Sequence, residues 1–122
     1  MNSGRVEGAE SNNDQFWSTM KILLWCDDLI NRMRLESAWK AVGATMLMKR
    51  ADDVPDLIVV DLRVRNACEH IAQLRSKHPE VIIVAFGPHF DADAFEAAKA
   101  AGATEIAAQG SIVERVTRRL RK

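Results

Sequence analysis

The chain has 122 residues, the length of one domain, and 48% of them are hydrophobic, an ordinary share for a protein with a buried core. Its 17 basic and 17 acidic side chains cancel, so the overall charge gives no pull toward nucleic acid or an anionic membrane. Two cysteines without zinc-like spacing, and the lack of a signal peptide or a membrane-length apolar stretch, predict a cytoplasmic, reducing location with no nucleic-acid or membrane partner.

Residues 1–19 are predicted to be a flexible leader, and residues 20–122 the folded domain. Polar and small residues dominate the leader, and it has no hydrophobic period. Phe16 and Trp17 are the exceptions. Docking of this aromatic pair on the domain or on a partner is an open alternative to the plainer view that it is poorly ordered.

Short apolar runs from residue 20 onward predict five strands. The runs at 22–26, 57–60 and 81–86 are continuous rather than alternating, which is typical of strands covered on both faces. The weaker runs at 44–48 and 105–108 fit the two edges of a sheet. All five strands are therefore expected to belong to one largely buried sheet.

Apolar residues at helical spacing predict a helix after four of the five strands. The periodic positions are Leu35, Ala38, Trp39 and Val42; Ala67, Ile71 and Leu74; Ala94, Ala98 and Ala101; Ile112, Val116 and Leu120. The link from Met48 to Leu57 is too short for a full crossover helix, so the second crossover helix is predicted to be short or missing. The sheet face near the second strand would then be thinly covered and would invite a partner or a second copy.

Strands that alternate with helices predict an α/β fold with a doubly wound parallel sheet. The flavodoxin-like strand order 2-1-3-4-5 is favoured, and it places the ends of the first and third strands side by side. Asp27 and Asp28 follow the first of these strands, and Asp61 ends the third. Carboxylates gathered at one edge repel unless a cation or a proton lies between them, so the pattern favours a divalent-metal pocket. The alternative is that these acids cap or solvate loops, with Asp28 as the N-cap of a helix beginning near Leu29.

Four segments resemble the receiver domains of bacterial response regulators, the CheY-like family. They are KILLWCDD, PDLIVVDL, HPEVIIVAFG and AAKAAGATEIAAQ, and they occur in the family's order at nearly its spacing over residues 20–122. The resemblance implies that Asp61 is the phosphoryl acceptor and that Asp27 belongs to the acidic pair that binds Mg²⁺. The other member of the pair is Cys26 by spacing to Gly43, or Asp28 if the pair is read as Asp-Asp.

Three departures from the family pattern predict a degenerate receiver, or pseudo-receiver, with at best weak Mg²⁺ binding. Ala85 stands where the family has a hydroxyl, and Gln109 stands where it has a lysine, followed by Gly110 in place of proline. The loop 62–66 lacks the family's proline and glycine. A lysine would give the phosphoryl group a charge-assisted contact of about 1.5–3 kcal/mol, whereas glutamine offers only neutral donors. The acceptor is kept, but the residues that transmit its charge are gone.

Arg63 and Arg65 flank the acidic site. They would either neutralise it as ion pairs, in place of the missing lysine, or be solvated. Solvation is favoured, because long charged side chains on a loop are usually exposed.

The favoured function is a stand-alone receiver-like module for signalling or protein interaction, without enzymatic activity. The resemblance implies a protein partner, either a histidine kinase or a downstream effector, with helix four, strand five and helix five as the contact face; self-association is a second expectation. One alternative is a still phosphorylatable two-component response regulator in a phosphorelay. Another is a metal-dependent phosphohydrolase with Asp61 or Asp27 as nucleophile. Against it, Arg63 and Leu29 occupy the positions two residues on, where related hydrolases have a second acid.

Overall fold

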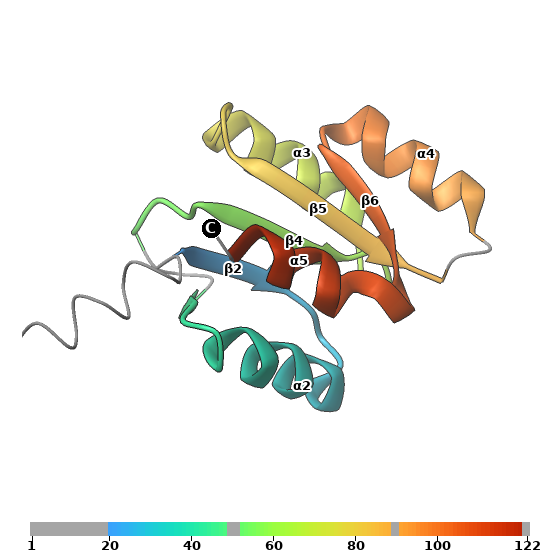
Figure 1. Ribbon diagram of the computed structural model, residues 1–122. Coiled ribbons are helices and arrows are strands. Elements are labelled where there is room, and N and C mark those ends of the chain that lie inside the picture. The colour runs from blue at the N-terminus through green and yellow to red at the C-terminus, as the bar shows by residue number, and fades with distance from the viewer. Residues whose placement is uncertain (1–19, 49–51, 89–90, 121–122) are drawn as a thin grey trace, which may run out of the picture.

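The structure, a computed structural model, describes residues 20–48, 52–88 and 91–120 (Figure 1). The predicted leader over 1–19 lies outside these ranges. The elements in chain order are β2 (Lys21–Trp25), α2 (Leu29–Lys40), β3 (Thr45–Leu47), β4 (Leu57–Asp61), α3 (Ala67–Lys77), β5 (Ile82–Gly87), α4 (Ala92–Ala101), β6 (Glu105–Ala108), the 3₁₀ turn η1 (Gln109–Ser111) and α5 (Ile112–Leu120). No helix among the described residues is both long enough and apolar enough to cross a bilayer.

The strands form one parallel sheet in the order β3-β2-β4-β5-β6. Counted along the chain, this is the predicted order 2-1-3-4-5, and the flavodoxin-like fold is confirmed. The short strands β3 and β6 lie at the edges, as their weak apolar runs predicted. Strand β4 is central and all five of its residues are buried, so its last residue, Asp61, is carried into the interior.

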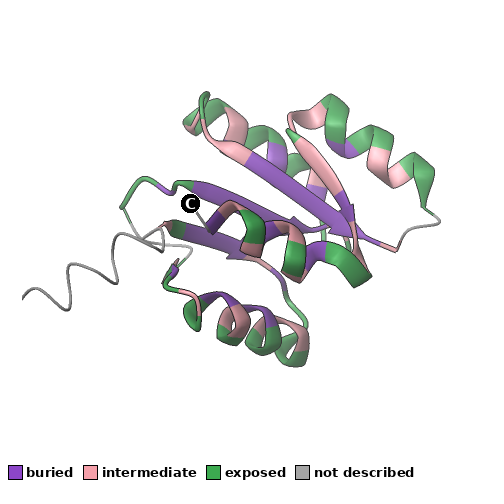
Figure 2. Cartoon of the chain, in the orientation of Figure 1, coloured by how far each residue is buried: buried purple, intermediate pink, exposed green. Residues whose placement is uncertain are grey.

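Helices cover both faces of the sheet, which explains why the inner strands are apolar throughout (Figures 1 and 2). Helices α2 and α5 pack on one face, around the fully buried Trp39. Trp39 Nε1 donates to the Val113 carbonyl at 3.2 Å and so joins these two helices. Helices α3 and α4 pack on the opposite face through residues such as Ile71 and Ala98.

The second crossover is short, as predicted. Between Leu47 and Leu57 the structure describes no helix, with residues 49–51 outside the described ranges. The side chains of Met48 and Val54, on either side of that gap, are 75% and 64% exposed. This corner of the sheet carries less cover than the rest, because a connection of this length cannot lay a helix across it.

Helix α2 begins at the edge where the candidate site lies. Asp28 is its N-cap and accepts a hydrogen bond from the Asn31 amide at 3.1 Å, which confirms the capping role weighed for this residue. Because the cap fixes the first turn of α2, the Asn31 side chain is held next to the end of β2.

Candidate functional site

The site is built where β2, β4 and β6 end on the same edge of the sheet. Cys26 follows β2, Asp61 is the last residue of β4, and Gln109 follows β6. Parallel strands bring their carboxyl ends to one edge, so three residues distant in sequence become neighbours there.

Asp61 is the one buried charged residue among those the structure describes, with 2% of its surface exposed. Its Oδ1 accepts from the backbone N–H of Arg63 at 2.9 Å and from Arg63 Nε at 3.2 Å. Its Oδ2 accepts from Arg63 Nη2 at 3.1 Å and from the thiol of Cys26 at 3.5 Å. A buried carboxylate is tolerated only when it is paired and hydrogen-bonded, and Asp61 is both.

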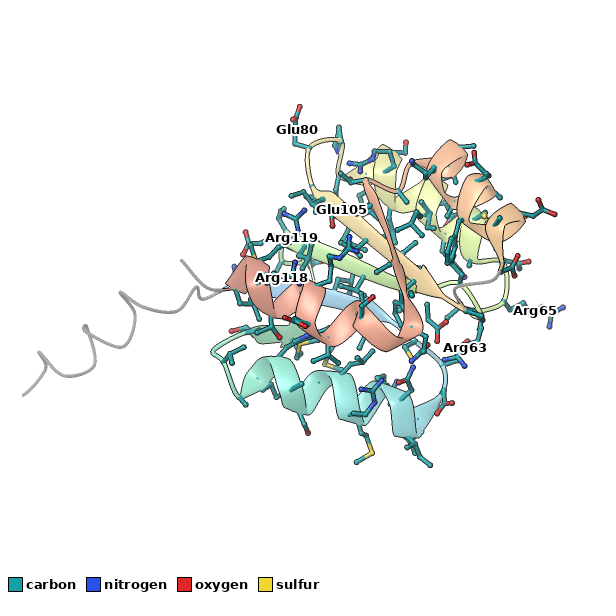
Figure 3. The ribbon with its side chains drawn as sticks, turned by 45° about the vertical axis from the view of Figure 1, so that its right-hand side comes forward. Arg63, Arg65, Glu80, Glu105, Arg118 and Arg119 are labelled. Atoms are coloured by element: carbon teal, nitrogen blue, oxygen red, sulfur yellow. The ribbon has the colours of Figure 1, made fainter. Side chains whose placement is uncertain are left out.

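Arg63 is therefore an ion-pair partner of Asp61, which was the disfavoured alternative, although its side chain stays 48% exposed. Its guanidinium lies at the end of the sheet beside the start of α5, whereas Arg65 extends away from the molecule (Figure 3). The hydrogen bond to Asp61 raises the pKa of Arg63 above its ordinary value, so the guanidinium stays protonated. Loop position alone did not decide the outcome, because the buried carboxylate two residues earlier needs a counter-charge.

The contacts around Asp61 close into a ring of five side chains. Arg63 Nη2 donates to Gln109 Oε1 at 3.2 Å, and Gln109 Nε2 donates to Asn31 Oδ1 at 3.3 Å. Asn31 Nδ2 lies 3.8 Å from Cys26 Sγ, and the Cys26 thiol returns to Asp61. The ring joins β2, α2, β4 and η1, so a displacement of any one of these elements disturbs the setting of the carboxylate.

Cys26 takes part in the ring as a thiol. Burial, and then the negative charge of Asp61 and the hydrogen bond to it, raise the pKa of Cys26 to about 11. At neutral pH its sulfur is therefore protonated and acts as a donor, although a weak one. Cys26 is fully buried, and its thiol hydrogen-bonds the carboxylate.

Asp27, Asp28 and Asp61 border one hollow of about 180 Å³, together with Arg63 and Val64. The convergence at one edge follows the prediction, but the three acids differ in setting, because Asp27 and Asp28 are exposed and Asp61 is buried. Within the described ranges, no group of three or more His, Cys, Asp or Glu side chains is arranged to hold a metal ion. With Arg63 on both oxygens of Asp61, this donor set does not fit a divalent cation.

The end of β5 offers no hydroxyl to the site. Ala85 pairs with Val60 and packs under α3 and α4, while Phe86 is the residue paired with Asp61. Gly87 ends the strand. The hydroxyl that the resemblance calls for is therefore missing whichever of these three positions corresponds to it.

Sequence reasoning missed Asn31 and Arg34. Asn31 Oδ1 accepts from Arg34 Nη2 at 2.9 Å as well as from Gln109, which makes Asn31 the hub between α2 and η1. One signal could have found it: a polar residue in the first turn of a helix that starts at the functional edge of the sheet. Its partner Gln109 lies 78 residues away, and only the fold brings the two together.

No protein-family model and no curated protein matches the sequence. Solved structures do match it in fold. A response regulator from Thermotoga maritima is 17% identical, with a TM-score of 0.67, over 82% of this chain and 96% of that chain. The receiver domain of NtrX from Brucella abortus is 17% identical, with a TM-score of 0.69, over 80% of this chain and 95% of that one.

A longer NtrX chain from Brucella abortus aligns with a TM-score of 0.72 at 17% identity. The match covers 84% of this chain but only 26% of that chain. The neighbours are thus response-regulator receiver domains, alone or within larger proteins, and their fold is the fold of this chain.

Proposed function

We propose that the chain is a receiver-like signalling module of the cytoplasm whose phosphotransfer site is degenerate. It acts through contact with a protein partner, a histidine kinase or a downstream effector, or through self-association. The receiver fold supports this proposal, as does Asp61 at the end of β4, the position that the resemblance gives to the acceptor.

One observation carries the degenerate reading: Gln109 is built into the ring as a neutral bridge. It accepts from Arg63 and donates to Asn31, and among the described residues these hydrogen bonds connect its side chain to Asp61 only through Arg63. A residue committed in this way cannot supply the positive charge that a lysine would bring to a phosphoryl group. With no hydroxyl at Ala85, Phe86 or Gly87, a modified Asp61 would also lack a group to draw toward it.

Two other functions fit less well. A phosphorylatable response regulator is favoured by the retention of Asp61, but its nucleophilic oxygens are occupied by Arg63. A phosphohydrolase would need an acid two residues after its nucleophile, and that position holds Arg63 after Asp61 and the 57%-exposed Leu29 after Asp27. Both are set aside in favour of the interaction module.

Amide NMR in the presence of Mg²⁺ and beryllofluoride, a phosphoryl mimic, tests the proposal. In the wild-type chain, we expect small shifts confined to the hollow and no propagated change along β5 or β6. The Asp61→Asn chain is the matched control, because it removes the carboxylate whose oxygen would coordinate the beryllium of the mimic. A large shift that spreads to Ala85 and Gln109 in the wild type, and is absent from the control, would restore the phosphorylation switch. Hydrolysis of a phosphate ester that is lost in Asp61→Asn would favour the enzyme.

The partner face is proposed on α4, β6 and α5. Glu105 on β6 pairs with Arg119 and Arg115 of α5, and Figure 3 places Glu105 and Arg119 close together. These pairs hold α5 against the edge strand. The pairs thus join two of the three elements of the proposed face.

A further inference from the structure

We propose that Arg63 is the built-in cation of this site: its guanidinium takes the place that a divalent metal ion would need and so keeps Mg²⁺ from Asp61. The inference deepens the proposed function, on which it rests, by naming what sets the state of the acceptor. It predicts that the affinity of the site for Mg²⁺ is set by the side chain of Arg63, two residues after Asp61.

The contacts of Asp61 carry the proposal. A carboxylate offers about four acceptor directions on its two oxygens. Four donors already use them, three from Arg63 and one from Cys26. Magnesium requires ligand oxygens at about 2.0–2.1 Å in near-octahedral geometry. It therefore cannot reach Asp61 until the Arg63 side chain leaves.

The surroundings of Arg63 explain why the guanidinium stays. Its planar fork binds one carboxylate with two parallel hydrogen bonds, which a point-like ammonium group cannot do. Its Nη2 is held from the other side by Gln109 at 3.2 Å. Its backbone N–H also binds Asp61, so the loop is anchored close to the carboxylate. The guanidinium thus supplies one fixed positive charge where a metal ion would supply two.

Removal of Arg63 should uncover a metal site. Asp27 and Asp28 border the same hollow, and a freed Asp61 would add a third carboxylate to it. Mg²⁺ is usually held by one or two carboxylates and keeps several of its waters, so it needs no cluster of three acids, and the variant should gain affinity for it once Arg63 no longer covers Asp61. Arg65 is the matched control, since it is an exposed arginine of the same loop that points away from the site (Figure 3).

The test is a Mg²⁺ titration of four chains, followed by amide NMR: wild type, Arg63→Met, Arg65→Met and the double variant Arg63→Met/Asp61→Asn. We expect Arg63→Met to bind Mg²⁺ at least about tenfold more tightly than the wild type, a gain of roughly 1.4 kcal/mol. Its saturable shifts should centre on Asp27, Asp28 and Asp61. Arg65→Met should behave as the wild type, and the double variant should lose the gain.

Equal Mg²⁺ affinity in the wild type and a folded Arg63→Met would overturn the proposal, as would a gain of the same size in Arg65→Met. If Arg63→Met does not fold, Arg63→Lys provides the second variant, because it keeps a charge but loses the fork; it should show an intermediate affinity, and an unchanged affinity would count against the proposal. Failure here would leave the receiver-like module standing, because that function is judged by the propagated response to beryllofluoride in the wild type.

Discussion

The thiol of Cys26 and the carboxylate of Asp61 lie 3.5 Å apart at the ends of adjacent strands, and the thiol donates to the carboxylate. A cysteine that loses its proton would place a second negative charge against a buried one. This pair therefore links the protonation of Cys26 to the stability of the fold.

Alkaline pH should destabilise the protein through Cys26. Burial and the charge of Asp61 raise the pKa of Cys26 from 9.0 to about 11. Below pH 9 both the folded and unfolded states hold the proton, and stability does not depend on this group. Between pH 9 and 11 the unfolded state releases it first, so the free energy of unfolding should fall, by up to about 2–3 kcal/mol at 1.36 kcal/mol per pKa unit.

Urea unfolding at pH 7, 9, 10 and 11 measures this loss, with Cys26→Ala as the comparison because it cannot ionise. The chain has no tyrosine, so thiolate absorbance near 240 nm can follow the titration without interference from tyrosinate. The slope between pH 9 and 11 should be shallower in Cys26→Ala. Parallel curves for the two chains would show that Cys26 is not the titrating group.

Loss of the Arg63 side chain should destabilise the fold and be partly offset by a second change at Asp61. Charged hydrogen bonds contribute about 1.5–3 kcal/mol. The Arg63 side chain is 48% exposed, so water can replace part of the contact and the lower end is expected for Arg63→Met. Asp61→Asn removes the buried charge, so the double variant should lose less than the sum of the single variants. Denaturant unfolding of all four chains gives the coupling energy; additive losses would mean that the pair does not interact.

Gly102→Ala should destabilise the protein by about 1–3 kcal/mol, because Gly102 ends α4 at a φ of +128°, a conformation that L side chains rarely adopt. An added Cβ would also lie 2.9 Å from Arg75 Cβ. Gly110→Ala is the matched control: no atom lies within 4 Å of its added Cβ, and the change should stay within about 0.5 kcal/mol. Thermal unfolding compares the two. Equal losses would remove the conformational explanation.

The fold was largely predictable because its signals are local. Continuous apolar runs identified the buried strands, and the short link after Met48 predicted that the second crossover helix is short or missing. The site was predictable only in part. Asp61 was identified by its place at the end of a buried run, and Asp28 by its place ahead of a helix. The ion pair of Arg63 was not the favoured alternative, because it depends on the burial of Asp61, and that burial is a property of the assembled sheet.

The order of apolar runs, helical periods and acidic strand ends determined the α/β architecture and the edge at which Asp61 lies, since such patterns act over a few residues. Only the tertiary structure determined which side chains surround Asp61. Cys26 meets its carboxylate because the ends of β2 and β4 converge, whereas Gln109 and Asn31 are linked to it through Arg63. Arg63 pairs with Asp61 because a charge removed from water must be matched by an opposite charge nearby.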